Sequence, residues 1–173
     1  EDLGYSVDSS VTPYKTHYYE SGTIRNCWGE RPFPYRVPGR HILQVPVTIV
    51  NRDFSRLPSF ILRLLEDRRT VARRILNRLG YRTRSEWFRP YRSTSENLID
   101  VAKELIRSFP ARREPVLNMM FHSNEIVHGM SPYCQTQEEV DEYVRSMTEV
   151  FSFLHRNYQV CSIGLGEYAS YFR

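Results

Sequence analysis

The sequence contains little cysteine, almost no lysine and no long apolar run. No stretch approaches the roughly 20 apolar residues that a membrane-spanning helix needs, and the first residues do not form a secretory signal. The three cysteines, Cys27, Cys134 and Cys161, lie far apart and form no C-x-x-C pair, which argues against a disulfide scaffold or a structural zinc ribbon. We therefore expect a soluble cytoplasmic protein with free thiols and no membrane span.

Arginine supplies almost all of the positive charge. The 173 residues are 40% hydrophobic and 13% aromatic, which predicts one domain over 1–173 with a sizeable core. Lys15 and Lys103 are the only lysines, and the formal net charge is +4. Arginines crowd the middle of the chain, at Arg52, Arg56, Arg63, Arg68, Arg69, Arg73, Arg74, Arg78, Arg82, Arg84, Arg89 and Arg92. Because acidic residues are interleaved and no nucleic-acid-binding motif is visible, we favour a solvated helix face over a nucleic-acid footprint.

Signals for strands and helices alternate along the chain. Gly4 predicts the glycine cap of a preceding helix, and Pro46 inside an apolar run predicts an edge strand or a bulge. Capping-box patterns at 93–96 and 136–139 each predict the start of a helix. Strands are expected at 5–11, 42–50, 115–121 and 159–163, a long loop at 12–40, and helices at 58–79, after each capping box and from Leu165. This alternation predicts an α/β fold with a mainly parallel sheet.

The apolar run at 115–121 stops at His122, which makes this histidine the first candidate for chemistry. Ligands and catalytic groups gather at the carboxyl ends of strands in α/β sheets. The polar residues Ser123, Asn124 and Glu125 follow directly, and a Gly-Met-Ser-Pro-Tyr turn lies beyond them. The alternative is a core histidine satisfied by its neighbours, and the polar residues weaken that interpretation.

The other candidates each have a structural alternative. Asp8, followed by two serines, is either a functional carboxylate or a turn residue. Trp87 and Arg89 belong to an aromatic segment that suits contact with a sugar ring or an acid, and equally suits a buried anchor. His128 is six residues from His122, which does not fit the i, i+4 metal motif of a helix. Spacing therefore assigns no metal ligand in this chain.

Five segments, taken in order, resemble the polysaccharide deacetylase family, the NodB-homology type of carbohydrate esterase, in the branch found in bacterial surface-polysaccharide gene clusters. They are LGYSVDSSVTP at 3–13, ILQVPVT at 42–48, WFRP at 87–90, LNMMFHSNE at 117–125 and GMSPY at 129–133. The resemblance extends from Gly4 to about Tyr168. It implies a partial or distorted (β/α) barrel, and a hydrolase that removes the acetyl group from an N-acetylated sugar with the help of a divalent metal.

The resemblance also implies roles for individual residues. His122 matches the late histidine that protonates the leaving amine, and an imidazole, with an ordinary pKa of about 6.5, can hold that proton near neutral pH. Asp8 matches the aspartate that orients or tunes this histidine, although Asp-Ser-Ser here replaces a more elaborate pattern. Arg89, Trp87 and Tyr133 are expected to bind the N-acetylated saccharide.

The metal ligands of the family precede the segment that matches Gly4, so the resemblance places the divalent metal, usually zinc, on residues outside this chain. Two interpretations follow. The chain is the C-terminal part of a larger deacetylase-like barrel, or it is a noncatalytic carbohydrate-binding relative. The expected helix end at Gly4 favours the first. The exposed edges of a partial sheet also predict self-association or pairing with the missing N-terminal half.

Overall fold

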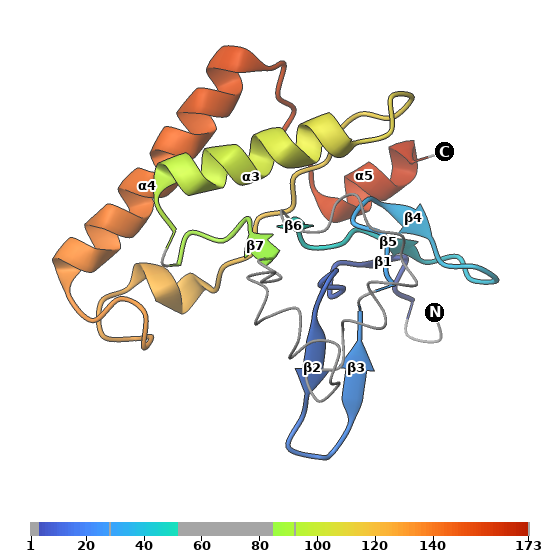
Figure 1. Cartoon of the computed structure of the whole chain (residues 1–173), viewed down its shortest axis with the longest axis horizontal. Coiled ribbons are helices and arrows are strands. Elements are labelled where there is room, and N and C mark those ends of the chain that lie inside the picture. The colour runs from blue at the N-terminus through green and yellow to red at the C-terminus, as the bar shows by residue number, and fades with distance from the viewer. Residues whose placement is uncertain (1–3, 28, 52–84, 92, 173) are drawn as a thin grey trace, which may run out of the picture. The chain divides into compact units, whose positions relative to one another are not determined.

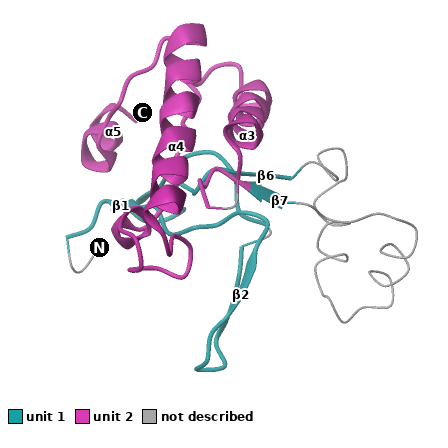
Figure 2. Cartoon of the chain, turned by 90° about the vertical axis from the view of Figure 1, so that its left-hand side faces the viewer, with its two compact units in different colours: residues 1–86 teal, residues 87–173 magenta. Residues whose placement is uncertain are grey.

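The computed structural model describes residues 4–27, 29–51, 85–91 and 93–172 (Figure 1). The predicted helix at 58–79, most of the arginine run and the helix expected before Gly4 lie outside the described residues. Gly4 itself has a φ of +78°, the left-handed conformation that a glycine cap requires. The chain divides into two compact units, Glu1–Glu86 and Trp87–Arg173 (Figure 2).

Short strands build the first unit. β1 (Val7–Asp8) pairs in parallel with β5 (Leu43–Gln44), and β4 (Tyr35–Arg36) pairs with β5 in the antiparallel direction. The predicted strand at 42–50 is divided into β5 and β6 (Ile49–Asn51), and Pro46 lies in the gap between them. This division has a physical reason, because proline cannot donate to a β-ladder.

The expectation of a long loop at 12–40 is wrong. This region contains β4 and an antiparallel hairpin of β2 (Thr16–Tyr18) and β3 (Ile24–Asn26). The turn of the hairpin is closed by Gly22, whose φ is +78° and whose N–H donates to the carbonyl of Tyr19 at 2.9 Å. Aromatic and β-branched residues on both sides of a glycine-containing turn are the sequence signal for such a hairpin.

Helices dominate the second unit. α3 (Ser95–Ser108) packs against α4 (Gln137–Asn157), and α5 (Leu165–Tyr171) begins where the sequence predicts a short helix (Figure 1). The capping box of α4 is confirmed, since Thr136 and Glu139 each bond the other's backbone N–H. α3 differs from its prediction by one residue, because its N-cap is Thr94 rather than the first serine of the pattern.

Two of the predicted strands are wrong. The segments at 115–121 and 159–163, both described in full, contain no strand. The first makes a backbone hydrogen bond from Met120 to the carbonyl of Phe88 at 3.3 Å, and the second is exposed along its whole length. A strand needs a neighbour that pairs with its backbone, and apolar composition alone does not supply one.

The strands of the described residues form three small sheets, of β1, β5 and β4, of β2 and β3, and of β6 and β7 (Ser85–Trp87). The content is therefore mixed α and β, and the (β/α) barrel stays a prediction. Among the described residues, no helix combines the length and the apolar composition that crossing a membrane requires.

Candidate functional site

The site is built around a buried carboxylate three residues after His122. His122 is the N-cap of η1, a 3-10 helix over Ser123–Ile126, and the backbone N–H of Glu125 donates to the carbonyl of His122 at 2.9 Å. In a 3-10 turn, side chains three residues apart lie one above the other. The Glu125 side chain is 0% exposed, whereas that of His122 is 64% exposed. The turn thus joins a buried acid to an accessible imidazole.

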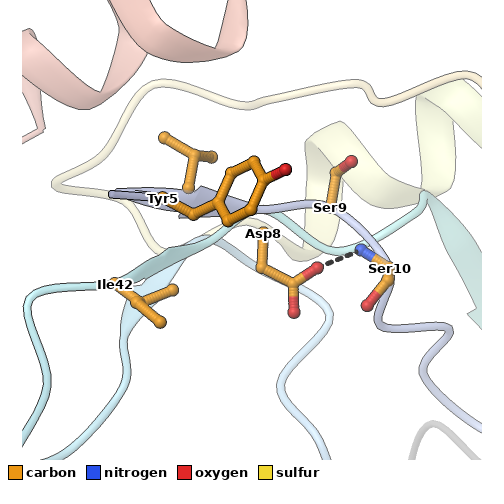
Figure 3. Close-up of a pocket in the computed structure, with 6 residues that line it drawn as sticks. Tyr5, Asp8, Ser9, Ser10 and Ile42 are labelled. Atoms are coloured by element: carbon orange, nitrogen blue, oxygen red, sulfur yellow. Dashed lines mark hydrogen bonds between the residues drawn. The ribbon is translucent and has the colours of Figure 1, made fainter. Parts of the chain in front are cut away.

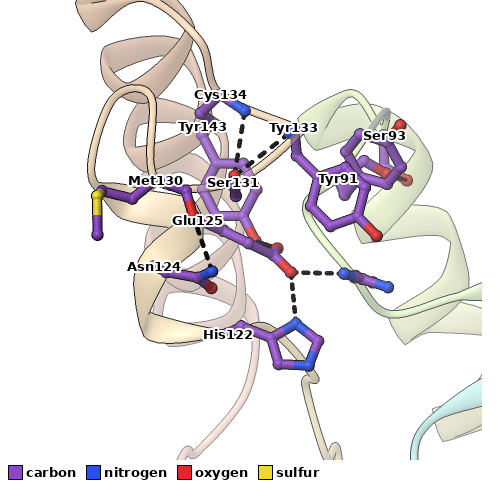
Figure 4. Close-up of polar contacts among 11 residues, drawn as sticks. Tyr91, Ser93, His122, Asn124, Glu125, Met130, Ser131, Tyr133, Cys134 and Tyr143 are labelled. Carbon is purple, nitrogen blue, oxygen red and sulfur yellow. Dashed lines mark hydrogen bonds and ion pairs between the residues drawn. The ribbon is translucent and has the colours of Figure 1, made fainter.

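Three side chains from separate parts of the second unit donate to Glu125. Nδ1 of His122 lies 2.7 Å from Oε1, and Nη2 of Arg89 lies 2.5 Å from the same oxygen. The Tyr143 hydroxyl donates to Oε2 at 2.6 Å (Figure 4). Arg89 follows β7, and Tyr143 is on the buried face of α4. Both carboxylate oxygens therefore have partners, as a buried acid requires.

The electrostatics of the site keep Glu125 ionised. Burial by itself raises the pKa of Glu125, but hydrogen bonds from Tyr143, His122 and Arg89, together with the Arg89 charge, outweigh burial and hold that pKa below its ordinary value. An ionised carboxylate has no proton to donate, so Nδ1 of His122 must carry the hydrogen that they share. The imidazole is consequently oriented with Nδ1 toward Glu125, which leaves Nε2 for chemistry.

Arg89 is held on its other side by aromatic rings. Its guanidinium lies 5.6 Å from the ring centre of Tyr91 and 5.2 Å from that of Tyr133, and the two ring centres are 4.0 Å apart. Such contacts stabilise a cation beside a ring face. The guanidinium thus contacts Glu125 and the two tyrosines. Arg89 shares Oε1 of Glu125 with His122, and its predicted contact with substrate stays a prediction.

Tyr133 and Trp87, the other two predicted substrate-binding residues, are both partly buried. Tyr133 packs against the cluster of Cys134, Val140 and Tyr143, directly beside the Glu125 network. Trp87 is the last residue of β7, two positions before Arg89. The structure therefore brings Tyr133 and Arg89 together and places Trp87 on the same short segment as Arg89.

Asp8 lies in the first unit, at the end of β1. Its Oδ1 accepts a hydrogen bond from the backbone N–H of Ser10 at 2.7 Å, the geometry of a local turn. Asp8 also lines an open pocket whose walls are Tyr5, Val7, Asp8, Ser9, Ser10 and Ile42 (Figure 3). The carboxylate that hydrogen-bonds to His122 in the second unit is Glu125, and a pairing of Asp8 with His122 stays a prediction.

From the sequence alone, Glu125 has no predicted role of its own and is named only as one of three polar residues after His122. The signal that could have identified it is the spacing His-x-x-Glu, because residues three apart share one side of a helical turn. Tyr143 lies within the helix that the capping box at 136–139 predicts, and its hydroxyl carries no separate signal in the sequence. Contacts between residues 18 and 36 positions apart, as for Tyr143 and Arg89 with Glu125, arise from the tertiary fold.

The zinc that the resemblance implies has no visible ligand set in the described part of the chain. Within that part, no three histidine, cysteine, aspartate or glutamate side chains come together in a way that could hold a metal ion. The cysteines there are free, and two of them are buried. Comparison of the chain with protein-family models, with curated proteins and with solved structures found no match.

Proposed function

We propose that this chain supplies the general acid for the metal-dependent deacetylation of an N-acetylated saccharide in bacterial surface-polysaccharide metabolism. The observation that carries the proposal is the pairing of His122 with Glu125, in which a fully buried carboxylate lies 2.7 Å from Nδ1 of an accessible imidazole. A base or acid oriented by a third group is the usual arrangement of a histidine that transfers protons. The resemblance of the surrounding sequence to polysaccharide deacetylases supplies the reaction class.

The reaction that this geometry serves is the hydrolysis of an acetamide. A base outside the described residues takes a proton from water as the water oxygen adds to the acetyl carbonyl carbon, and the tetrahedral intermediate collapses as the C–N bond breaks. The electron pair of that bond goes to the amine nitrogen, which takes the proton from Nε2 of His122, so that acetate and a free amine leave. Glu125 stays ionised and accepts the Nδ1–H bond throughout, which stabilises the imidazolium before the transfer and fixes the ring after it.

Activation of the water and polarisation of the carbonyl are the chemistry that a divalent metal supplies in this reaction class. The described residues do not gather a ligand set for that metal. The step assigned to this chain is therefore the proton transfer and the orientation of the group that performs it. The metal site, zinc by resemblance, is proposed to come from polypeptide outside the described residues.

The test is acetate release from N,N′-diacetylchitobiose by this chain together with the polypeptide proposed to hold the metal, supplied with Zn²⁺ and compared between wild type and His122→Ala. Loss of a general acid is expected to lower kcat by about 100-fold to 10,000-fold. His155→Ala is the matched control, because His155 is an exposed histidine in the last turn of α4 and should leave the rate unchanged. A rate for His122→Ala within threefold of wild type would exclude the proposed role. A rate for His155→Ala as low as that for His122→Ala would exclude it too.

A noncatalytic carbohydrate-binding protein is the second candidate. The observation that favours it is the pair of partly buried tyrosine rings, Tyr91 and Tyr133, whose centres lie 4.0 Å apart beside Arg89. Aromatic faces of this kind suit the apolar face of a sugar ring. This candidate predicts saccharide binding by wild type and by His122→Ala alike, with no acetate released by either.

A further inference from the structure

We propose that Tyr143 is a positioning residue for His122, which acts by holding the Glu125 carboxylate in the orientation that selects the Nδ1–H form of the imidazole. Its catalytic meaning depends on the function proposed above, but its effect on His122 does not. The inference concerns a hydroxyl on α4 whose hydrogen bond goes to Glu125. It therefore assigns to the helix a role in the site besides packing.

The geometry divides the carboxylate between two tasks. Oε1 receives both Nδ1 of His122 and Nη2 of Arg89, whereas Oε2 receives the Tyr143 hydroxyl at 2.6 Å. A carboxylate can rotate about its last side-chain bond, and a hydrogen bond to one oxygen fixes the position of the other. Tyr143 is the hydrogen-bond partner of Oε2, so its hydroxyl, together with Arg89 on Oε1, fixes where Oε1 meets the imidazole (Figure 4).

The hydroxyl of Tyr143 has no evident role in packing. The ring lies in an apolar cluster with Cys134 and Val140, where phenylalanine would fill the same space. A buried hydroxyl without a partner is costly, so its presence there is explained by the bond to Glu125. Burial and the bond to Glu125 both raise the pKa of Tyr143, so the phenol remains a donor at neutral pH.

The experiment is long-range ¹H–¹⁵N NMR of the histidine side chains in the full chain, with the His122 signals identified by their loss in His122→Asn. This measurement separates the Nδ1–H and Nε2–H forms of a neutral imidazole. We expect wild type to hold His122 in the Nδ1–H form. In Tyr143→Phe, we expect the ratio of the two forms to fall by about threefold or more, the scale of one ordinary intramolecular hydrogen bond.

The matched control is Tyr158→Phe, which removes a phenol at the C-cap of the same helix and should leave the ratio unchanged. A second variant carries 3-fluorotyrosine at position 143, which keeps a donor and should retain the wild-type ratio even if Tyr143→Phe folds poorly. An unchanged ratio in a folded Tyr143→Phe, or a ratio in the fluorotyrosine variant that falls to the Tyr143→Phe value, would overturn the inference.

Acetate release from N,N′-diacetylchitobiose, by the chain assayed with Zn²⁺ and with the polypeptide proposed to hold the metal, separates this inference from the proposed function. If both hold, Tyr143→Phe lowers kcat by about tenfold with little change in KM, since a misplaced proton donor slows the chemical step without altering binding. If wild type releases no acetate while the NMR ratio still falls, the proposed function fails and the positioning role of Tyr143 stands. If acetate is released and the ratio does not move, only the positioning role fails.

Discussion

Replacement of Arg89 by methionine should destabilise the protein strongly at neutral pH. Methionine keeps an unbranched side chain beside Tyr91 and Tyr133 but removes the cation from a carboxylate that is 0% exposed. Removal of one partner from a buried ion pair costs about 3–5 kcal/mol. Because the donors of Tyr143 and His122 remain on Glu125, we place the loss somewhat below this range, at about 2–4 kcal/mol in the free energy of unfolding.

Urea unfolding followed by circular dichroism measures this loss, and its pH dependence identifies the cause. A carboxyl whose pKa is lowered by folding stabilises the protein fully above its ordinary value of about 4.5, and that stabilisation disappears as the pH falls through the folded value. Without Arg89, Glu125 accepts a proton more readily. The difference between wild type and Arg89→Met should therefore narrow between pH 7 and pH 4.

The double variant Arg89→Met with Glu125→Gln completes the test. It removes both charges, so it should recover part of the stability that Arg89→Met loses. A loss below about 1 kcal/mol that does not change with pH would show an ordinary surface pair and would refute the buried network.

Three further predictions concern the framework of the site. Thr136→Ala should cost about 1 kcal/mol in unfolding free energy through loss of the α4 cap, whereas Thr148→Ala on the exposed face of α4 should cost nothing. Gly129→Ala should lower Tm, because its φ is +71°, whereas Gly166→Ala, inside α5 and without a positive φ, should not; equal effects would refute the backbone argument. Stability should also fall as the pH rises above 10, since Tyr143 must stay protonated and its pKa is raised by folding, and Tyr143→Phe should weaken this dependence in alkaline urea titrations.

The parts of the fold that the sequence predicted well are those that local interactions determine. The cap at Thr136 and the apolar spacing after it define α4 because every contact involved lies within a few residues. The runs at 115–121 and 159–163 have the composition of strands, but a strand exists only through a partner distant in the sequence. Their backbone pairing could not be read from the segments themselves.

The site likewise combines contacts within a few residues, which the sequence can predict, with contacts between distant residues, which it cannot. His122 was identified from an expected strand end, whereas the structure makes it the cap of a 3-10 turn. Its partner Glu125 was within reach of sequence reasoning, because the two residues are neighbours on that turn. Arg89 and Tyr143 became partners of Glu125 only through the packing of the second unit, and no local pattern encodes such a meeting.

The distance along α4 from its N-cap to Tyr143 limits which mutations the start of this helix can tolerate. Tyr143 comes seven residues after the N-cap Thr136, which is about two helical turns and about 10 Å along the axis. A single inserted or deleted residue in the first two turns would rotate the phenol by about 100° around the helix and carry its hydroxyl away from Glu125. The number of residues between 136 and 143 thus sets the position of the Tyr143 hydroxyl in the site. Natural variation there should take the form of substitutions rather than changes of length.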